Sequence, residues 1–229
     1  MKTDALNFAA LVPIKEASQR LPKKNFLKFC GKPLYHYILE TLCKVSQIRE
    51  VIVDTDSAEI LDCAPNISSK IKAIPRKRDL CGDYAPFLDI LHYDMSKSKC
   101  DHFIQSHVTN PLLTVETVES GIEFYSTHWR TCGSVFSAVP IRSRLYKGGH
   151  AINHDPLDRL LRTQDLEEVY KENSNFYIFS RENMSKENHR IGSRSLPFMM
   201  KELESVDIDN KEDFILAELL YQNFQHGGK

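Results

Sequence analysis

The chain has 229 residues, of which 41% are hydrophobic and 27% are charged, and its formal net charge is −1 at pH 7. This length and composition suit one globular domain over residues 1–229 with a sizeable core. The near-neutral charge argues against a general nucleic-acid-binding protein, which would be basic overall. No stretch reaches the length of a membrane span, and the first residues, MKTDALNFAA, lack the apolar core of a signal peptide.

The six cysteines lie far apart, and none of them forms a CxxC pair. Secreted disulfide scaffolds are shorter and richer in cysteine, so we expect reduced thiols. Together with the missing membrane and signal patterns, the cysteine spacing predicts a soluble, cytoplasmic protein.

Short apolar runs alternate with helical patterns along the chain. Strands are predicted at 8–14, 50–55, 71–75, 102–108, 133–141 and 175–179. Helices are predicted at 33–42, 56–64, 86–95 and 114–125, and a terminal helix bears Phe214, Ala217, Leu220, Tyr221 and Phe224. This order predicts an α/β fold, in which helices cover both faces of a mainly parallel sheet. Ligands of such sheets bind beyond the carboxyl ends of the strands.

The loop after the first strand is strongly basic. Residues 15–25 contain four cations and a single acid, namely Lys15, Arg20, Lys23, Lys24 and Glu16. A bound triphosphate would relieve the repulsion among these cations, and Ser18 and Asn25 add neutral hydrogen-bonding groups. The loop has neither the P-loop pattern nor GxGxxG, so composition alone favours a solvated basic loop.

Residues 141–174 interrupt the pattern with a polar, glycine-containing stretch that is too long for an ordinary connection. A lid, a flexible insertion and an arm that packs on a second subunit are the alternatives. Apolar side chains along the stretch favour the arm of a homodimer: Leu145, Tyr146, Leu157, Leu160, Leu161, Leu166, Val169 and Tyr170. His150 and His154 would form a metal-binding pair only on a helix, which GGHAINHDP does not favour, so we reject that site.

Several motifs, in order, resemble those of the acylneuraminate cytidylyltransferases (CMP-sialic acid synthetases). P-x-K-x-x-S-x-R-L-P-x-K-N runs from Pro13 to Asn25, and GKPL follows at 31–34. VIVDTDSAEI, PRKRDLCGDYAPFLDIL, HVTNPLL and VDIDNKEDFILAE then succeed one another in the family's order as far as about Leu220. The related CMP-Kdo synthetases usually have proline where Asn25 stands, and this difference favours the acylneuraminate group.

The resemblance implies a Rossmann-like, three-layer nucleotidyltransferase fold with a dimerisation arm at 141–174. It also implies the transfer of CMP from CTP to the anomeric hydroxyl of a 2-keto-3-deoxy sugar acid, with release of pyrophosphate. The implied nucleotide contacts are Lys15, Ser18, Arg20, Lys24, Asn25, Arg76 and Asp83. Lys15 and Lys24 would also serve catalysis, and Asn25 would read the cytosine edge. The implied sugar contacts, some of them made across the dimer, are His107, Thr109, Lys147, Arg162, Gln164, Asn173 and Tyr177.

Some residues depart from the family's pattern and leave the preferred sugar open: Lys15, Glu16, Ala17, His107 and Leu113. The alternative functions are a nucleotidyltransferase for another sugar acid such as Kdo, one for a sugar phosphate, or a catalytically silent nucleotide-binding member. Arg76 could be a plain surface arginine. His107 could be a structural histidine, a donor to the sugar or an acceptor of its proton.

Asp207 and Asp209 stand two residues apart before the terminal helix. In an extended segment both side chains project to one face, so the pair is predicted to bind Mg²⁺ together with phosphates and water. The alternative is that Asp209 caps the terminal helix, with Glu212 three residues later, although both roles can hold for Asp209. That alternative gives no reason for Asp207.

Overall fold

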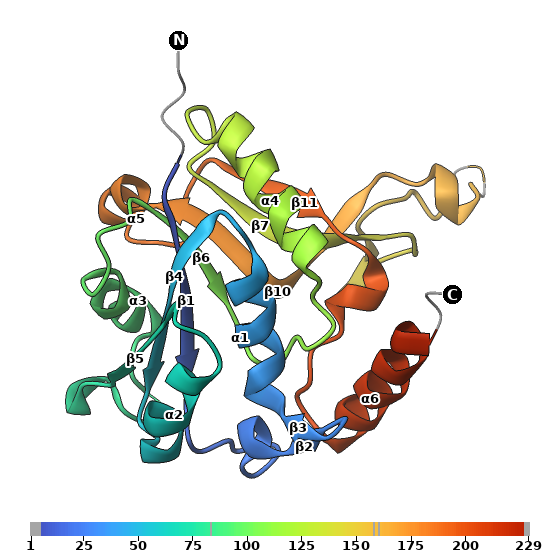
Figure 1. Ribbon diagram of the computed structural model, residues 1–229. Helices are drawn as coiled ribbons and strands as arrows, with labels where there is room; N and C mark the ends of the chain where they lie inside the picture. The colour runs from blue at the N-terminus through green and yellow to red at the C-terminus, as the bar shows by residue number, and fades with distance from the viewer. Residues whose placement is uncertain (1–5, 83, 158, 160, 227–229) are drawn as a thin grey trace.

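A seven-stranded sheet forms the middle of the molecule (Figure 1). The structure is a computed structural model, and it describes residues 6–226 except 83, 158 and 160. The strand order is β11-β7-β10-β6-β1-β4-β5. The strands are β1 (Phe8–Ile14), β4 (Ile48–Thr55), β5 (Ile71–Pro75), β6 (His102–Ser106), β7 (Ser134–Ile141), β10 (Val169–Ser180) and β11 (Ser195–Met199). All neighbours pair in parallel except β10, which is antiparallel to β6 and β7. The predicted mainly parallel sheet is confirmed.

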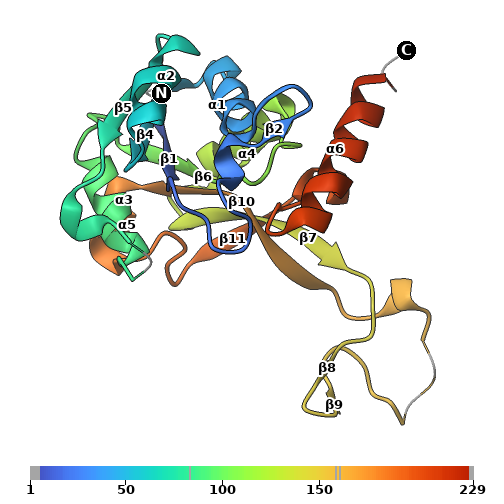
Figure 2. The same cartoon turned by 90° about the horizontal axis from the view of Figure 1, so that it is seen from below.

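Helices cover both faces of this sheet (Figure 2). One face carries α1 (Leu34–Lys44), α2 (Ala58–Cys63) and α4 (Val115–His128), and the other carries α3 (Phe87–Met95) and α5 (Arg181–Glu187). Along β1, Ala10 and Val12 pack into the first layer, whereas Ala9 and Leu11 pack into the second. A strand that is buried on both sides needs a continuous apolar run, and the FAALVPI segment supplies one.

The terminal helix α6 (Lys211–His226) packs on a small hairpin rather than on the sheet. The hairpin consists of β2 (Lys28–Phe29) and β3 (Lys32–Pro33), and Phe29 shares a buried cluster with Ala217 of α6. Cys30 and Gly31 form the hairpin turn with φ angles of 43° and 100°. Two left-handed residues in succession are typical of the tight turn that suits twisted strands. Short 3-10 helices lie at Lys24–Phe26, Ala64–Asn66, Arg78–Leu80, Thr163–Asp165 and Glu202–Ser205.

The cap of α6 differs from the predicted alternative. The Asn210 side chain accepts a hydrogen bond from the Asp213 N–H at 2.9 Å. The Asp213 carboxylate in turn accepts from the N–H groups of Asp209 and Asn210, at 2.9 and 3.0 Å. This reciprocal arrangement satisfies the first turn, so the alternative in which Asp209 caps the helix is wrong. The Asp209 carboxylate is therefore available for other contacts.

Residues 141–174 leave the body of the protein as an extension that ends in the hairpin β8 (Tyr146–Lys147) and β9 (His150–Ala151) (Figure 2). Tyr146, Leu157 and Tyr170 are 56%, 95% and 42% exposed in the single chain, and Leu160 lies outside the described residues. Exposed apolar side chains on a projecting segment agree with the predicted arm, whose partner remains a prediction.

All six cysteines are free thiols. Among the described residues, no helix combines the length and the apolar character that a membrane crossing requires.

Candidate active site

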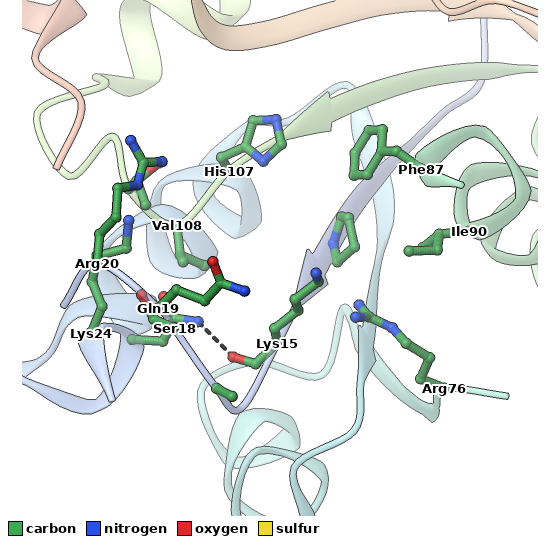
Figure 3. A pocket seen from close by; sticks show the side chains of 14 residues that line it. Lys15, Ser18, Gln19, Arg20, Lys24, Arg76, Phe87, Ile90, His107 and Val108 are labelled. Carbon is green, nitrogen blue, oxygen red and sulfur yellow. Dashed lines mark hydrogen bonds between the residues drawn. The ribbon is translucent and has the colours of Figure 1, made fainter. Parts of the chain in front are cut away.

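A cavity of about 400 Å³ opens at the carboxyl ends of β1, β5 and β6. Predicted residues from separate segments meet around it: Lys15, Ser18, Arg20, Lys24, Asn25, Arg76, His107 and Thr109. Figure 3 shows Lys15 and Arg76 on one side of the cavity and Lys24 and Arg20 on the other. None of the described lining residues is acidic, so the local field favours an anion of small-molecule size.

Lys24 connects the first loop to the segment that precedes α6. Its Nζ atom lies 2.5 Å from the carbonyl oxygen of Ile208 and 3.5 Å from Oδ1 of Asp209. Arg20 Nη1 lies 2.6 Å from Oδ2 of the same aspartate. The Arg20 side chain is 69% exposed, so this ion pair contributes little to stability. Lys24 is buried, and its bonds hold two distant segments against one another.

Asn25 fixes the course of the first loop. Its Nδ2 donates to the Lys15 carbonyl oxygen at 2.8 Å, drawn as the dashed line in Figure 3. A carbonyl oxygen only accepts, so the amide group must point its NH₂ toward Lys15. The Oδ1 atom of Asn25 is left as an acceptor beside the cavity that the residue lines. The Glu16 N–H, one residue further along, donates to Asp56 Oδ1 at 2.7 Å.

Arg76 is held by buried acids. Its Nε donates to Asp54 Oδ1, and its Nη2 donates to the Asp54 carbonyl oxygen at 3.2 Å. Burial raises the pKa of Asp54, an effect that the Arg76 guanidinium opposes. Burial and the neighbouring Asp54 raise the pKa of Asp94, on α3, to about 9. At neutral pH Asp94 is therefore protonated and hydrogen-bonds the Asp54 carboxylate. Arg76 is thus an internal residue of the cavity wall and not a plain surface arginine.

His107 stands at the end of β6, with its ring 5.8 Å from the ring of Phe87 across the cavity wall (Figure 3). Burial and the positive charges of Arg190 and Lys24 lower the pKa of His107 to about 4. The imidazole is consequently neutral over the physiological range. Its Nε2 lies 3.1 Å from Nε2 of Gln105.

Asp207 and Asp209 contact residues that line the cavity: Asp207 is next to Thr109, and Asp209 forms ion pairs with Arg20 and Lys24. Burial raises the pKa of Asp207, and a hydrogen bond from Thr109 works in the opposite direction. Oδ1 of Asp207 is buried without a hydrogen-bond partner. Two carboxylates two residues apart, one of them with an unpartnered buried oxygen, are a donor set that fits a hard cation such as Mg²⁺. No cluster of three or more potential ligands occurs in the described part of the chain, so phosphates and water would have to complete the coordination.

The remaining predicted sugar contacts do not line the cavity in the single chain. Tyr177 is buried in β10; its hydroxyl donates to the Glu172 carboxylate and lies 3.1 Å from Oγ of Ser174. Asn173 is also buried and accepts from Ser137 Oγ at 2.6 Å. Three others are exposed on the projecting segment: Lys147, Arg162 and Gln164. Arg162 forms an ion pair there with Asp165 at 2.7 Å. Asp83, a predicted nucleotide contact, lies outside the described residues.

Five residues that the sequence motifs do not predict complete the site: Asp54, Phe87, Asp94, Gln105 and Arg190. The sequence carries a signal for two of them. Asp54 and Asp94 interrupt apolar runs, VIVDT and FLDILHYDM, at positions where a side chain is buried. Gln105 and Arg190 carry no such signal, because they meet only through the fold.

The fold and the cavity together place this chain in a class of α/β proteins. In that class an anionic ligand binds at the carboxyl ends of the strands of a mainly parallel sheet. The profile of the cytidylyltransferase family matches residues 9–224. The chain therefore belongs to the cytidylyltransferase family.

Curated relatives are similar at low identity. An N-acylneuraminate cytidylyltransferase of Streptococcus agalactiae is 27% identical over 90% of this chain and 51% of that protein. A pseudaminic acid cytidylyltransferase of Campylobacter jejuni is 25% identical over 93% of this chain and 95% of that protein. The CMP-N,N'-diacetyllegionaminic acid synthase of Legionella pneumophila is 27% identical over 95% and 97%. The chain thus spans about half the length of the first relative and nearly all of the other two. The predicted resemblance is confirmed.

Solved structures share the fold. A CMP:2-keto-3-deoxy-manno-octonic acid synthetase complexed with CTP superposes with a TM-score of 0.68 at 17% identity, over 96% of this chain and 99% of that one. A 4-diphosphocytidyl-2C-methyl-D-erythritol synthase of Anaerococcus prevotii superposes with a TM-score of 0.67 at 12% identity, over 96% and 97%. These matches confirm the predicted nucleotidyltransferase fold.

Proposed function

We propose that this chain transfers CMP from CTP to the anomeric hydroxyl of a 2-keto-3-deoxy sugar acid of the nonulosonic class and releases pyrophosphate. The observation that carries the proposal is the convergence of Lys15 and Lys24, from the two ends of the first loop, and Arg76, from the segment after β5, on one cavity whose described lining contains no acid. Membership of the cytidylyltransferase family supports the nucleotide. The names of the relatives, which refer to N-acylneuraminic, pseudaminic and legionaminic acids, support the acceptor class.

The cations of the cavity would neutralise the triphosphate. Lys15 and Lys24 would contact phosphate oxygens, with Ser18 donating a neutral hydrogen bond and Arg20 approaching from the solvent side. Arg76 is already oriented by Asp54, so its remaining N–H groups would meet the nucleotide without a loss of side-chain freedom on binding.

Asn25 would select the base. With its NH₂ bonded to the Lys15 carbonyl, its Oδ1 would accept from the exocyclic amino group of cytosine. Uracil presents a carbonyl oxygen at that position, so two acceptors would face one another and the complex would be destabilised.

The reaction needs alignment and charge neutralisation more than a strong base. The anomeric oxygen would form a bond to the α-phosphorus, and the bond from that phosphorus to the oxygen bridging to the β-phosphate would break. The hydroxyl proton would leave to water or to a phosphate oxygen, and pyrophosphate would carry away the electron pair. Asp207 and Asp209 would hold Mg²⁺, which when bound supplies Lewis-acid stabilisation of the phosphate charge.

The sugar acid would lie near His107 and Thr109, next to the α-phosphate. Lys147, Arg162 and Gln164 lie on the projecting segment, so in this proposal they would act on the site of a neighbouring subunit in a homodimer. This arrangement would explain why the cavity is lined by so few sugar contacts of its own chain.

A pyrophosphate-release assay tests the proposal. The assay combines CTP or UTP with sialic, legionaminic, pseudaminic or Kdo acid, and with a sugar phosphate. We expect release only with CTP and at least one of the nonulosonic acids. Lys24→Met should lose most of the rate, and Lys99→Met, at an exposed lysine, should keep it. Release with Kdo or a sugar phosphate alone would contradict the acceptor class. Binding of CTP in calorimetry without release from any acceptor would instead identify a silent nucleotide-binding protein.

A further inference from the structure

A chain of polar groups, buried at its middle, runs from Arg190 to the cavity wall. Arg190 follows α5, and its Nη1 donates to Oε1 of Gln105 at 2.6 Å. The Gln105 side chain is fully buried in β6, and its Nε2 lies 3.1 Å from Nε2 of His107. The chain therefore consists of a guanidinium, an amide and an imidazole, and it ends on a residue that lines the cavity.

The orientation of the Gln105 amide is determined by its neighbours. A guanidinium only donates, so the oxygen of the amide must face Arg190. The Gln105 NH₂ also donates to the Ser106 carbonyl at 3.1 Å, and a carbonyl only accepts. Both contacts require the same assignment of oxygen and nitrogen. In a flipped amide the NH₂ would face the Arg190 guanidinium, donor against donor, and the oxygen would face the Ser106 carbonyl, acceptor against acceptor.

The orientation of Gln105 determines the tautomer of His107. An amide NH₂ cannot accept, so Nε2 of His107 must accept the hydrogen bond and cannot carry a proton. In a neutral imidazole the proton is then on Nδ1. Within the described residues no hydrogen bond is formed by this atom, and His107 is a partly exposed residue that lines the cavity.

Arg190 is itself held in place. Its guanidinium carbon lies 3.6 Å from the centre of the Tyr177 ring and 5.0 Å from the centre of the Phe87 ring. Stacking between two aromatic faces restrains a guanidinium and suits its planar charge. The neighbouring positive charge also disfavours a second proton on His107.

We propose that Arg190 and Gln105 are positioning residues that hold His107 as a neutral hydrogen-bond donor with its proton on Nδ1. His107 then donates to an acceptor oxygen of the sugar acid, either its carboxylate or a hydroxyl oxygen, and does not take the proton of the attacking hydroxyl. This inference rests on the proposed function for the identity of the ligand. The tautomer itself is a property of the free protein.

Nitrogen-15 NMR of the free protein reads the tautomer directly. Long-range correlation spectra of histidine-labelled protein at pH 7, assigned with His107→Gln, should show a protonated Nδ1 and an unprotonated Nε2 for His107. Arg190→Lys keeps a donor toward Gln105 and should preserve this pattern. Arg190→Met removes the donor, and Gln105→Glu places an acceptor beside Nε2, so both should move proton density to Nε2. A proton on Nε2 in the unaltered protein would overturn the proposal, as would a pattern insensitive to both Arg190→Met and Gln105→Glu.

Steady-state kinetics then separate a positioning role of Arg190 and Gln105 from a nonspecific loss of structure in the variants. Arg190→Met and Gln105→Glu should raise KM for the sugar acid on the order of tenfold or more and leave KM for CTP within about twofold. Arg190→Lys should recover most of the loss. Equal effects on both substrates, without recovery by lysine, would overturn the positioning role. If the unaltered protein turns over no sugar acid, the proposed function fails, whereas the NMR result still decides the tautomer.

Discussion

Lys24 Nζ lies 2.5 Å from the carbonyl oxygen of Ile208, a residue 184 positions later in the chain. This bond places the basic first loop against the acidic segment that contains Asp207 and Asp209. The proposed metal ligands thereby lie next to Lys24 and Arg20, two of the cations that line the cavity.

The proposed Mg²⁺ site is tested through Asp207, because Oδ1 of this residue is buried without a hydrogen-bond partner. Asp207→Asn keeps the shape and removes the charge. We expect kcat to fall on the order of 100-fold or more, as for a lost electrostatic contact in a transition state, with little change in CTP binding. Chelation by EDTA should abolish turnover. Glu202→Gln, at an exposed acid just upstream, should keep the normal rate. Undiminished turnover in EDTA, or by Asp207→Asn, would rule out the metal site.

The protein should also bind the cation only together with the nucleotide, because two carboxylates cannot complete an octahedral shell. Calorimetric titration with Mg²⁺ should show tight binding in the presence of CTP and weak binding in its absence. Equal binding in both conditions would mean that the ion occupies a different site.

Base selection is tested by two substitutions of Asn25. Asn25→Ala should raise KM for CTP and reduce discrimination against UTP by about 1–3 kcal/mol. Asn25→Asp keeps the acceptor oxygen but loses the donor to the Lys15 carbonyl, so it should slow the enzyme while retaining preference for CTP. The readout is the ratio of kcat/KM for the two nucleotides. If both variants keep the normal ratio, Asn25 only shapes the loop.

The buried pair of Asp54 and Asp94 predicts a dependence of stability on pH. Folded Asp94 keeps its proton up to a pKa of about 9, whereas an unfolded aspartate loses it near pH 4. The folded state therefore binds the extra proton between these values, and the free energy of unfolding falls as the pH rises.

Asp94→Asn should flatten this slope, since its amide still donates to the Asp54 carboxylate but does not titrate. We expect the variant to be more stable than the parent by at least about 1 kcal/mol at pH 8, measured by denaturant unfolding. Asp89→Asn, at an exposed acid on the same helix, should retain the parental slope. If the free energy of unfolding of Asp94→Asn depends on pH as strongly as that of the parent, then Asp94 does not hold a proton against the Asp54 carboxylate.

The arm at 141–174 predicts a homodimer. Light scattering at micromolar concentration should give the mass of two chains. Leu157→Glu combined with Tyr146→Ser should shift the protein toward monomer and raise KM for the sugar acid, because both side chains are exposed in the single chain. Leu219→Ser removes an exposed apolar group of α6 and should leave the mass unchanged. A fully active monomer would refute the arm's role.

Most of the sheet could be predicted because strands buried on both faces need uninterrupted apolar runs. The first half of β10 could not, since VYKENS is polar and pairs with β7 where the arm leaves the body. Helix α5 was also not predicted, because RENMSKE is short and polar. Its start is fixed by Ser180, which accepts from the Asn183 N–H at 3.0 Å.

The cationic part of the site could be read from one short motif, because the first loop carries most of it in consecutive residues. The partners of His107 could not, since Gln105 and Arg190 are 85 residues apart and their bond exists only in the folded chain. Sequence also left open whether His107 donates or accepts, and that choice depends on which atoms of Gln105 face it.

Phosphorus-31 NMR of a single reaction mixture tests the central claim most directly. The purified protein is incubated with CTP, Mg²⁺ and a nonulosonic acid, and the signals of the three CTP phosphates are followed over time. We predict that they give way to pyrophosphate and to one phosphodiester signal of a CMP-sugar in equal amounts, and that neither product forms without the acid. Appearance of free CMP or CDP in place of the phosphodiester, or no change with any nonulosonic acid, would contradict the account.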